Sequence, residues 1–246
     1  GALALGVDGA IGGKLALPAF ALQPLLTATL GSASPVPGSV WSPARFQAAP
    51  GLGEIRLAIT TERLAVSEQL ALDKAAFQLA TGIDGLSISD LSGRHAGGEV
   101  SGGLSIRREG GLAQLSGRLG LAGLDLATLT GGALTGKLSG RFEAGGSGES
   151  PARLIAGLGG AGSISVSGAG MSRFDPAALS RVIAATGEDA SESETERLQD
   201  RIATALEQAN WPLGDVTVPF TQAGGGLRVQ PVTFERAGLR AEASGT

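Results

Sequence analysis

Apolar residues alternate with small or polar residues along most of the chain. The spacing of two is seen at Ile55, Leu57 and Ile59, and it returns at Phe77 and Leu79. Further pairs with this spacing are Leu64 and Val66, Leu70 and Leu72, Leu86 and Ile88, Leu104 and Ile106, Leu119 and Leu121, Ile164 and Val166, Val216 and Val218, and Leu227 and Val229. Because successive side chains of a strand point to opposite sides, this period predicts β-strands with one apolar face.

Turn signals separate these segments at short intervals. Gly pairs or polar clusters arrive about every 8–12 residues, a spacing that is typical of antiparallel meanders. One phrase recurs at 97–102 and 131–136: a Gly pair, a variable residue, an aliphatic residue, Ser or Thr, and Gly. Glycine supplies the positive φ of tight hairpins and β-bulges. We therefore predict a mainly β fold, a long antiparallel meander of roughly a dozen strands.

The interruptions of this pattern predict loops and helices. Residues 18–50 are Pro-rich and aperiodic, which predicts a long traversing loop. Ser150-Pro151 opens a short helix that the glycines of 157–160 end. Residues 175–210 are expected to form a helical insertion, with an acidic loop at 187–196. We predict a single structural region over 1–246, with two or three short helices inserted near its C-terminal end.

Composition excludes several classes of function. The chain has 41 Gly, no Cys, one His and a net charge of −4. Zinc fingers, disulfide scaffolds and thiol catalysis all need the missing cysteines. The acidic balance and the few aromatic residues argue against nucleic-acid binding. The chain starts at Gly1 within a strand-like pattern, so we expect a fragment of a larger protein. Its most apolar stretch, 15–30, contains two prolines and is shorter than the ~20 residues of a spanning helix, so we expect any membrane anchor outside it.

The isolated motifs carry little chemistry. Residues 157–162 match G-x-G-x-x-G, but a helix precedes them and a strand follows, the reverse of a dinucleotide site. His95 has no second His for a metal and is read as a polar strand or turn residue. The acidic run at 188–196 lacks the alternating ligands and central Gly of a calcium loop. We expect no enzyme activity, no cofactor and no metal.

The order of the segments resembles that of the AsmA family, over most of residues 40–246. Residues 85–102 (GLSISDLSGRHAGGEVSG) are similar to the repeating phrase of that family. The other matching segments are 41–46, 138–142, 151–158, 160–166 and 174–179. Sheet, small helix, Gly-rich strand and capped helix follow one another as in the C-terminal region of AsmA-like proteins. The acidic stretch at 188–196 departs from this pattern.

The resemblance implies a non-enzymatic protein of the Gram-negative cell envelope, with a periplasmic body anchored to the inner membrane. Relatives of the family include TamB and bridge-like lipid transfer proteins, whose sheet curls into an open apolar groove (a β-taco or half-barrel). For this chain it implies an open, groove-forming sheet that moves phospholipid between the inner and outer membranes. Phospholipid acyl chains and other envelope proteins are the implied partners, and nucleic acid is not one. The alternative function is a periplasmic scaffold that assists outer-membrane protein assembly.

The apolar positions of the earlier strands are our candidates for the groove lining. They are Ile55, Leu57, Ile59, Leu64, Val66, Phe77, Leu79, Leu86, Ile88, Leu104 and Ile106. Aliphatic residues without polar anchors favour nonspecific contact with acyl chains. The same residues are equally compatible with an ordinary protein core, because aliphatic side chains are more often packed than exposed to a ligand. The sequence leaves both interpretations open.

Overall fold

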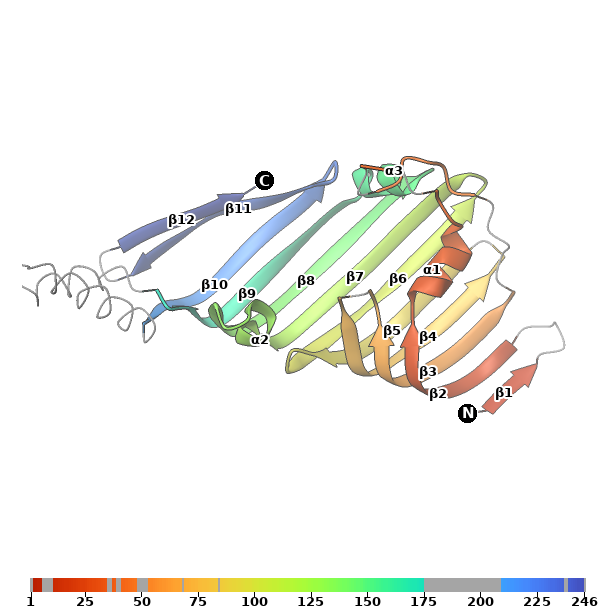
Figure 1. Ribbon diagram of the computed structural model, residues 1–246, viewed down its shortest axis with the longest axis horizontal. Helices are drawn as coiled ribbons and strands as arrows, with labels where there is room; N and C mark the ends of the chain where they lie inside the picture. The colour runs from red at the N-terminus through yellow and green to blue at the C-terminus, as the bar shows by residue number, and fades with distance from the viewer. Residues whose placement is uncertain are drawn as a thin grey trace, which may run out of the picture.

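The structure is a computed structural model that describes residues 2–5, 11–34, 37–38, 41–47, 53–67, 69–83, 85–174, 209–236 and 239–245. The described strands join in one open, curled sheet in the order of the chain (Figure 1), which confirms the predicted mainly β fold. They are β1 (Ala2–Leu5), β2 (Ile11–Ala21), β3 (Ile55–Ala65), β4 (Ala71–Gly82), β5 (Gly85–His95), β6 (Gly98–Glu109), β7 (Leu112–Asp125), β8 (Leu134–Gly148), β9 (Gly159–Ser172), β10 (Asn210–Ala223), β11 (Gly226–Arg236) and β12 (Leu239–Gly245). The described helices are α1 (Gln23–Leu30), α2 (Leu126–Thr130) and α3 (Pro151–Ala156).

One pair of neighbouring strands departs from the predicted antiparallel meander. β2 and β3 run parallel, with Ile11 opposite Ile55 and Ala21 opposite Ala65. Every other described neighbour pair is antiparallel, as expected for a meander. Parallel neighbours cannot be joined by a hairpin and need a crossover connection. Residues 22–54 make this crossover, and they carry α1 onto one face of the sheet.

The predicted loop at 18–50 is therefore wrong over its first third. β2 continues to Ala21, and α1 follows from Gln23 to Leu30. Pro18 is tolerated in β2 because β1 pairs only with residues 11–14 and Pro18 has no partner in the ladder with β3, so no described strand needs its missing N–H. Pro24 lies in the first turn of α1, where a helix has spare N–H groups. Both prolines indicated a loop, and each occupies a position where regular structure accepts proline.

The short helices are defined by their caps. α3 confirms the helix expected after Ser150-Pro151: the Ser150 hydroxyl accepts a hydrogen bond from the Arg153 N–H (3.2 Å). α2 was not predicted, because five residues are too few to show a periodicity. The helical insertion at 175–210 lies outside the described residues, except for its last two positions. Of these, Asn210 already begins β10.

Asp125 caps α2, and its titration is the first testable prediction. Its Oδ1 accepts hydrogen bonds from the Thr128 N–H (2.9 Å) and hydroxyl, and its Oδ2 lies 3.0 Å from Lys137 Nζ. The Thr128 N–H first, and then Lys137, lower the pKa of the Asp125 carboxyl below its ordinary value. A lowered folded-state pKa stabilises the fold above the ordinary Asp value of about 4, and this contribution is lost as pH falls through the folded pKa.

We expect the carboxyl ¹³C signal of Asp125 to titrate with a midpoint below that of an ordinary Asp. In Lys137→Gln the midpoint should rise part of the way back, because the Thr128 hydrogen bond persists. A wild-type midpoint at or above the ordinary value would contradict the capping geometry.

β-bulges keep the apolar residues on one face of the sheet. The register shifts between Ile88 and Leu91 of β5 and between Leu121 and Leu124 of β7. Asp90 (φ 52°) and Gly123 (φ 66°) take left-handed conformations within these shifts. Each pair is three residues apart, which in a regular strand would place the two side chains on opposite faces. With the bulge, both members of each pair contact the same core.

Candidate functional site

One face of the sheet is apolar from β3 to β10. The register places Leu79 opposite Ile88, and Ile88 opposite Leu104. Further along the sheet, Leu119 lies opposite Phe142. Side chains of directly opposite residues share a face, so these rows form one continuous apolar surface. We call it the apolar face.

The part of the apolar face over β3–β6 is covered. α1 lies over β5 and β6 (Figure 1), and its Leu25, Leu26 and Leu30 pack against the buried core. Seven of the predicted groove residues belong to this core, and none of them is more than 5% exposed. They are Ile59, Leu64, Phe77, Leu79, Leu86, Ile88 and Ile106. Leu57, Val66 and Leu104 are partly buried against the same core, and Ile55 is half-buried at the start of β3.

The assignment of these residues to an open groove therefore needs correction. They do lie on one face, but in this arrangement they form a covered core and are not accessible to a ligand. The physical reason is the crossover from β2 to β3, which the sequence did not reveal. It places β2 beside β3 and α1 over the adjacent strands, so the aliphatic side chains have a protein layer against them.

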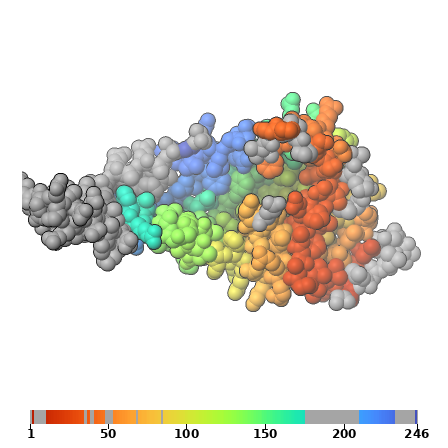
Figure 2. All heavy atoms as spheres, viewed as in Figure 1, coloured from red at the N-terminus to blue at the C-terminus, as the bar shows by residue number. Residues whose placement is uncertain are grey.

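The same face is open over β7–β10 within the described part of the chain. Leu119 of β7 is 40% exposed. Six further apolar side chains of this face on β8–β10 are half-buried and lie outside the core cluster; they are Phe142, Ile164, Val166, Val216, Val218 and Phe220. Leu124 of β7 belongs to that cluster, and Leu115, Leu121 and Leu138 pack against its edge. In Figure 2 the surface is hollowed over the green and teal strands, between the red α1 region and the blue C-terminal strands. We call this region the open groove.

Helices border the open groove on three sides. α1 closes the side over β5 and β6, and α2 and α3 lie at opposite ends of β7 and β8 (Figure 1). Leu154 of α3 and Leu126 of α2 are 5% and 7% exposed, so both helices are anchored by a buried leucine. Gly148 allows the close approach of α3, because a Cβ there would overlap the backbone nitrogen of Leu154. Among the described elements, the groove continues only past β9 toward β10 and β11.

Two phenylalanines form part of the groove floor. Phe142 of β8 and Phe220 of β10 both lie opposite Gly162 of β9, and their ring centroids are 5.6 Å apart. A Cβ on Gly162 would stand 2.6 Å from Cζ of Phe220 and 2.5 Å from the Arg141 carbonyl oxygen. Gly162 thus permits the rings to meet over β9, which leaves a smooth apolar floor without polar anchors.

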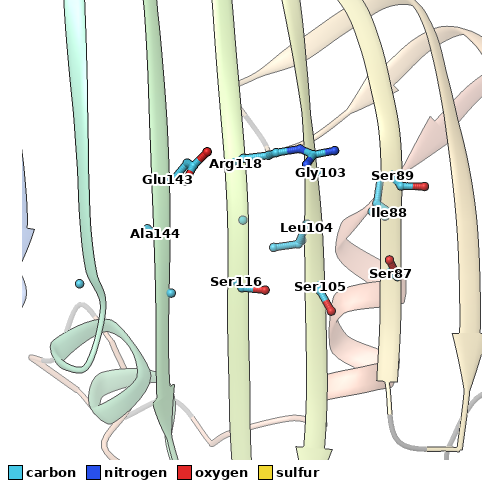
Figure 3. Close-up of a pocket in the computed structure, with 13 residues that line it drawn as sticks. Ser87, Ile88, Ser89, Gly103, Leu104, Ser105, Ser116, Arg118, Glu143 and Ala144 are labelled. Carbon is cyan, nitrogen blue, oxygen red and sulfur yellow. The ribbon is translucent and has the colours of Figure 1, made fainter.

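The opposite face of the sheet is polar and carries a shallow depression (Figure 3). Ser87, Ser105 and Ser116 lie in one row across β5, β6 and β7. Arg118 extends over Gly103 and stands opposite Glu143 of β8. Hydroxyl groups and charges of both signs suit a surface that is exposed to water.

The other sequence motifs take structural positions. Nδ1 of His95 lies 3.0 Å from the Ala71 carbonyl oxygen, a contact that ties β5 to the start of β4. Residues 157–162 run from the end of α3 into β9, so no helix N-terminus follows their glycines. Where the chain is described, no three His, Asp or Glu side chains gather as a metal site requires. No helix among the described ones is long and apolar enough to cross a bilayer.

Comparison with known proteins found no match for this chain among protein-family models, curated proteins or solved structures.

The residues of the open groove were missed as a site, although their pattern was visible. Leu119, Ile164 and Val218 show the same alternation as the residues that turned out to be covered. Periodicity identifies an apolar face, but it does not tell which part of that face receives a covering layer. The position of α1 decides which part of the face is covered, and strand pairing between β2 and β3 decides the position of α1.

Proposed function

We propose that this chain binds phospholipid acyl chains in the open groove and passes them between the inner and outer membranes of a Gram-negative envelope. The observation that carries the proposal is a continuous apolar face that is half covered by its own chain and half uncovered among the described residues. A large contiguous apolar patch at the surface of a protein marks a site that contacts a ligand, a partner or a membrane. The resemblance to the AsmA family supports a periplasmic, inner-membrane-anchored setting.

The energetics of such a groove suit transfer. Burying one methylene contributes about 0.8 kcal/mol, so a sixteen-carbon chain in a dry groove gains on the order of 10 kcal/mol. This gain is comparable to what the chain loses on leaving a bilayer, so the transfer step is close to neutral. Aliphatic and aromatic side chains without a polar anchor make a uniform track, along which an acyl chain can slide. No bond is made or broken, so the proposed role is non-enzymatic.

Leu119→Asp should lower the phospholipid bound by the purified full chain by about tenfold, because it places a charge against the acyl chains. Leu119 is 40% exposed, so the substitution leaves the covered core intact. The matched control is Ser116→Asp on the same strand, whose side chain points to the polar face. Bound phospholipid is measured by mass spectrometry after extraction from membranes, with circular dichroism as the check on folding.

Equal losses in the two variants, or no phospholipid on the wild-type protein, would refute the proposal. The second result would favour the alternative of an assembly scaffold. A scaffold would use the strands at the edges of the described sheet, β1 and β12, because an edge strand can pair with a strand of another chain.

A further inference from the structure

We propose that α1 is an end stop of the open groove, which prevents acyl chains from passing beyond the boundary between β6 and β7. This inference rests on the proposed function. The apolar face itself continues without interruption from β7 to β6, because Leu115 lies opposite Ile106 and Leu121 opposite Val100. Among the described elements, α1 makes its main sheet contacts with β5 and β6 and not with β7, and its leucines pack against a core whose last buried strand residue is Leu124 of β7. The helix thus occupies the path that acyl chains would otherwise follow.

Arg108 of β6 holds the C-terminal end of α1. Its Nη1 donates hydrogen bonds to the carbonyl oxygens of Leu30 (2.6 Å) and Gln47 (2.8 Å). Its guanidinium carbon lies 5.7 Å from the ring centroid of Phe46. A cation at a helix C-terminus also interacts favourably with the helix dipole. One side chain therefore joins the last residue of α1, the segment that follows α1, and the sheet.

α1 depends on these tertiary contacts for its position. It has eight residues, no side-chain N-cap and no acidic residue in its first turn. The hydroxyls of Thr27 and Thr29 bond to carbonyl oxygens within the same helix. An isolated helix of this length is marginal in water. Nε of Arg108 is buried without an acceptor among the described residues. The hydrogen bonds by which Arg108 holds α1, which we call the clamp, therefore leave one of its N–H groups unpaired. A single substitution should therefore loosen the clamp.

The segment after α1 ties the end stop to the rim of the groove. The Phe46 N–H donates to the Glu149 carbonyl oxygen (3.0 Å), and the Ala152 N–H of α3 donates to the Ser42 carbonyl oxygen (3.0 Å). Arg45 and Glu149 form an exposed ion pair at 3.0 Å. Residues 42–46 thus join the segment that follows α1 to α3. The side of the groove that α1 closes is therefore continuous with the end that α3 closes. Acyl chains that enter from β10 should meet α1 and turn or stop there.

Photo-crosslinking maps this boundary. The probe is a phosphatidylethanolamine with a diazirine at the terminal carbon of one acyl chain, incorporated in vesicles and incubated with the full chain. Peptide mass spectrometry should locate adducts at Leu119, Phe142 and Val218, and none at Leu79, Leu86 or Ile88. Adducts at Leu79, Leu86 or Ile88 in the wild-type protein, at yields equal to those of β7–β10, would overturn the end stop. Absence of all adducts would instead overturn the proposed function, so the two failures are distinguishable.

Arg108→Gln tests whether the clamp maintains the boundary. Loss of two hydrogen bonds from a charged donor should increase the fraction of molecules in which α1 has left the sheet. Adducts should then appear at Ile88, where the wild-type protein has none, and increase at the neighbouring Leu104. Arg107→Gln is the matched control, because its exposed side chain lies on the polar face of the same strand. An unchanged map in a folded Arg108→Gln variant would refute the role of Arg108. If that variant does not fold, the wild-type map alone decides whether the groove stops at α1.

Discussion

Replacing Ile59 by alanine is expected to lower the free energy of unfolding by about 3–4 kcal/mol. Ile59 is 1% exposed and lies in β3 between Leu15 of β2 and Phe77 of β4. The substitution removes buried methyl and methylene groups and leaves a cavity between the flanking strands β2 and β4. A cavity at this point has no flexible neighbour to fill it, because both flanking positions are held by strand pairing. The measurement is equilibrium unfolding in urea, followed by far-ultraviolet circular dichroism.

The matched control is Ile83→Ala in the turn between β4 and β5. Ile83 is 84% exposed, so its truncation should change the unfolding free energy by no more than about 0.5 kcal/mol. Similar effects at the two positions would mean that the β3–β6 half of the apolar face is not a packed core. The covered residues would then return as candidates for a ligand-lined groove.

Gly148→Ala is expected to cost about 3 kcal/mol of stability and to displace α3. A Cβ at Gly148 would lie 2.5 Å from the Arg153 carbonyl carbon and would overlap the Leu154 nitrogen. Both obstacles are backbone atoms, which cannot swing aside as the end of a side chain does. The helix must move away from β8, and Leu154 must leave its buried position. The exchange rate of the Leu154 amide proton, together with urea unfolding, measures this displacement.

Gly82→Ala is the control for a glycine at the end of a strand. A Cβ at Gly82 meets no atom within 4 Å, and its backbone is outside the left-handed region. Its substitution should be close to neutral. If Gly148→Ala were equally neutral, α3 would not be packed tightly enough on β8 to close that end of the groove.

Much of the β architecture was predictable, because it depends on local chemistry. The alternation around Ile88 and Leu104 is enough to place both on one face, and Ser150-Pro151 is enough to start α3. The Gly pair at 131–132 takes the expected positive φ (62° and 86°), but it ends the helix α2 and does not form the hairpin or bulge that was predicted. In each case the determining residues are neighbours in the sequence.

The misplaced elements depend on distant residues. The stretch with Pro18 and Pro24 is helix and strand because β3 offers a parallel partner and β5 and β6 offer an apolar surface. Neither condition is visible within residues 18–50. The same holds for the bulge at Asp90, where a non-glycine residue takes positive φ so that Leu91 can contact the core. Periodicity alone would have turned Leu91 outward.

The candidate site was harder to predict than the fold, for a related reason. Ile88 and Ile164 have similar sequence surroundings, with Ser on both sides, yet one is buried in the core and the other lines the open groove. The difference between them is α1, which covers the first and does not reach the second. The sequence therefore predicted the chemistry of the surface correctly as apolar, and it could not predict which part is accessible.

The crossover from β2 to β3 also fixes the order in which the molecule can be completed during synthesis. Leu30 receives a hydrogen bond from a residue 78 positions later, so α1 has no docking surface until β6 has left the ribosome. Until then the leucines of α1 lack the sheet surface against which they pack in the folded protein. Contacts that span so much chain are slow to form. The docking of α1 should thus follow the pairing of β5 with β6, although α1 precedes both strands in the chain.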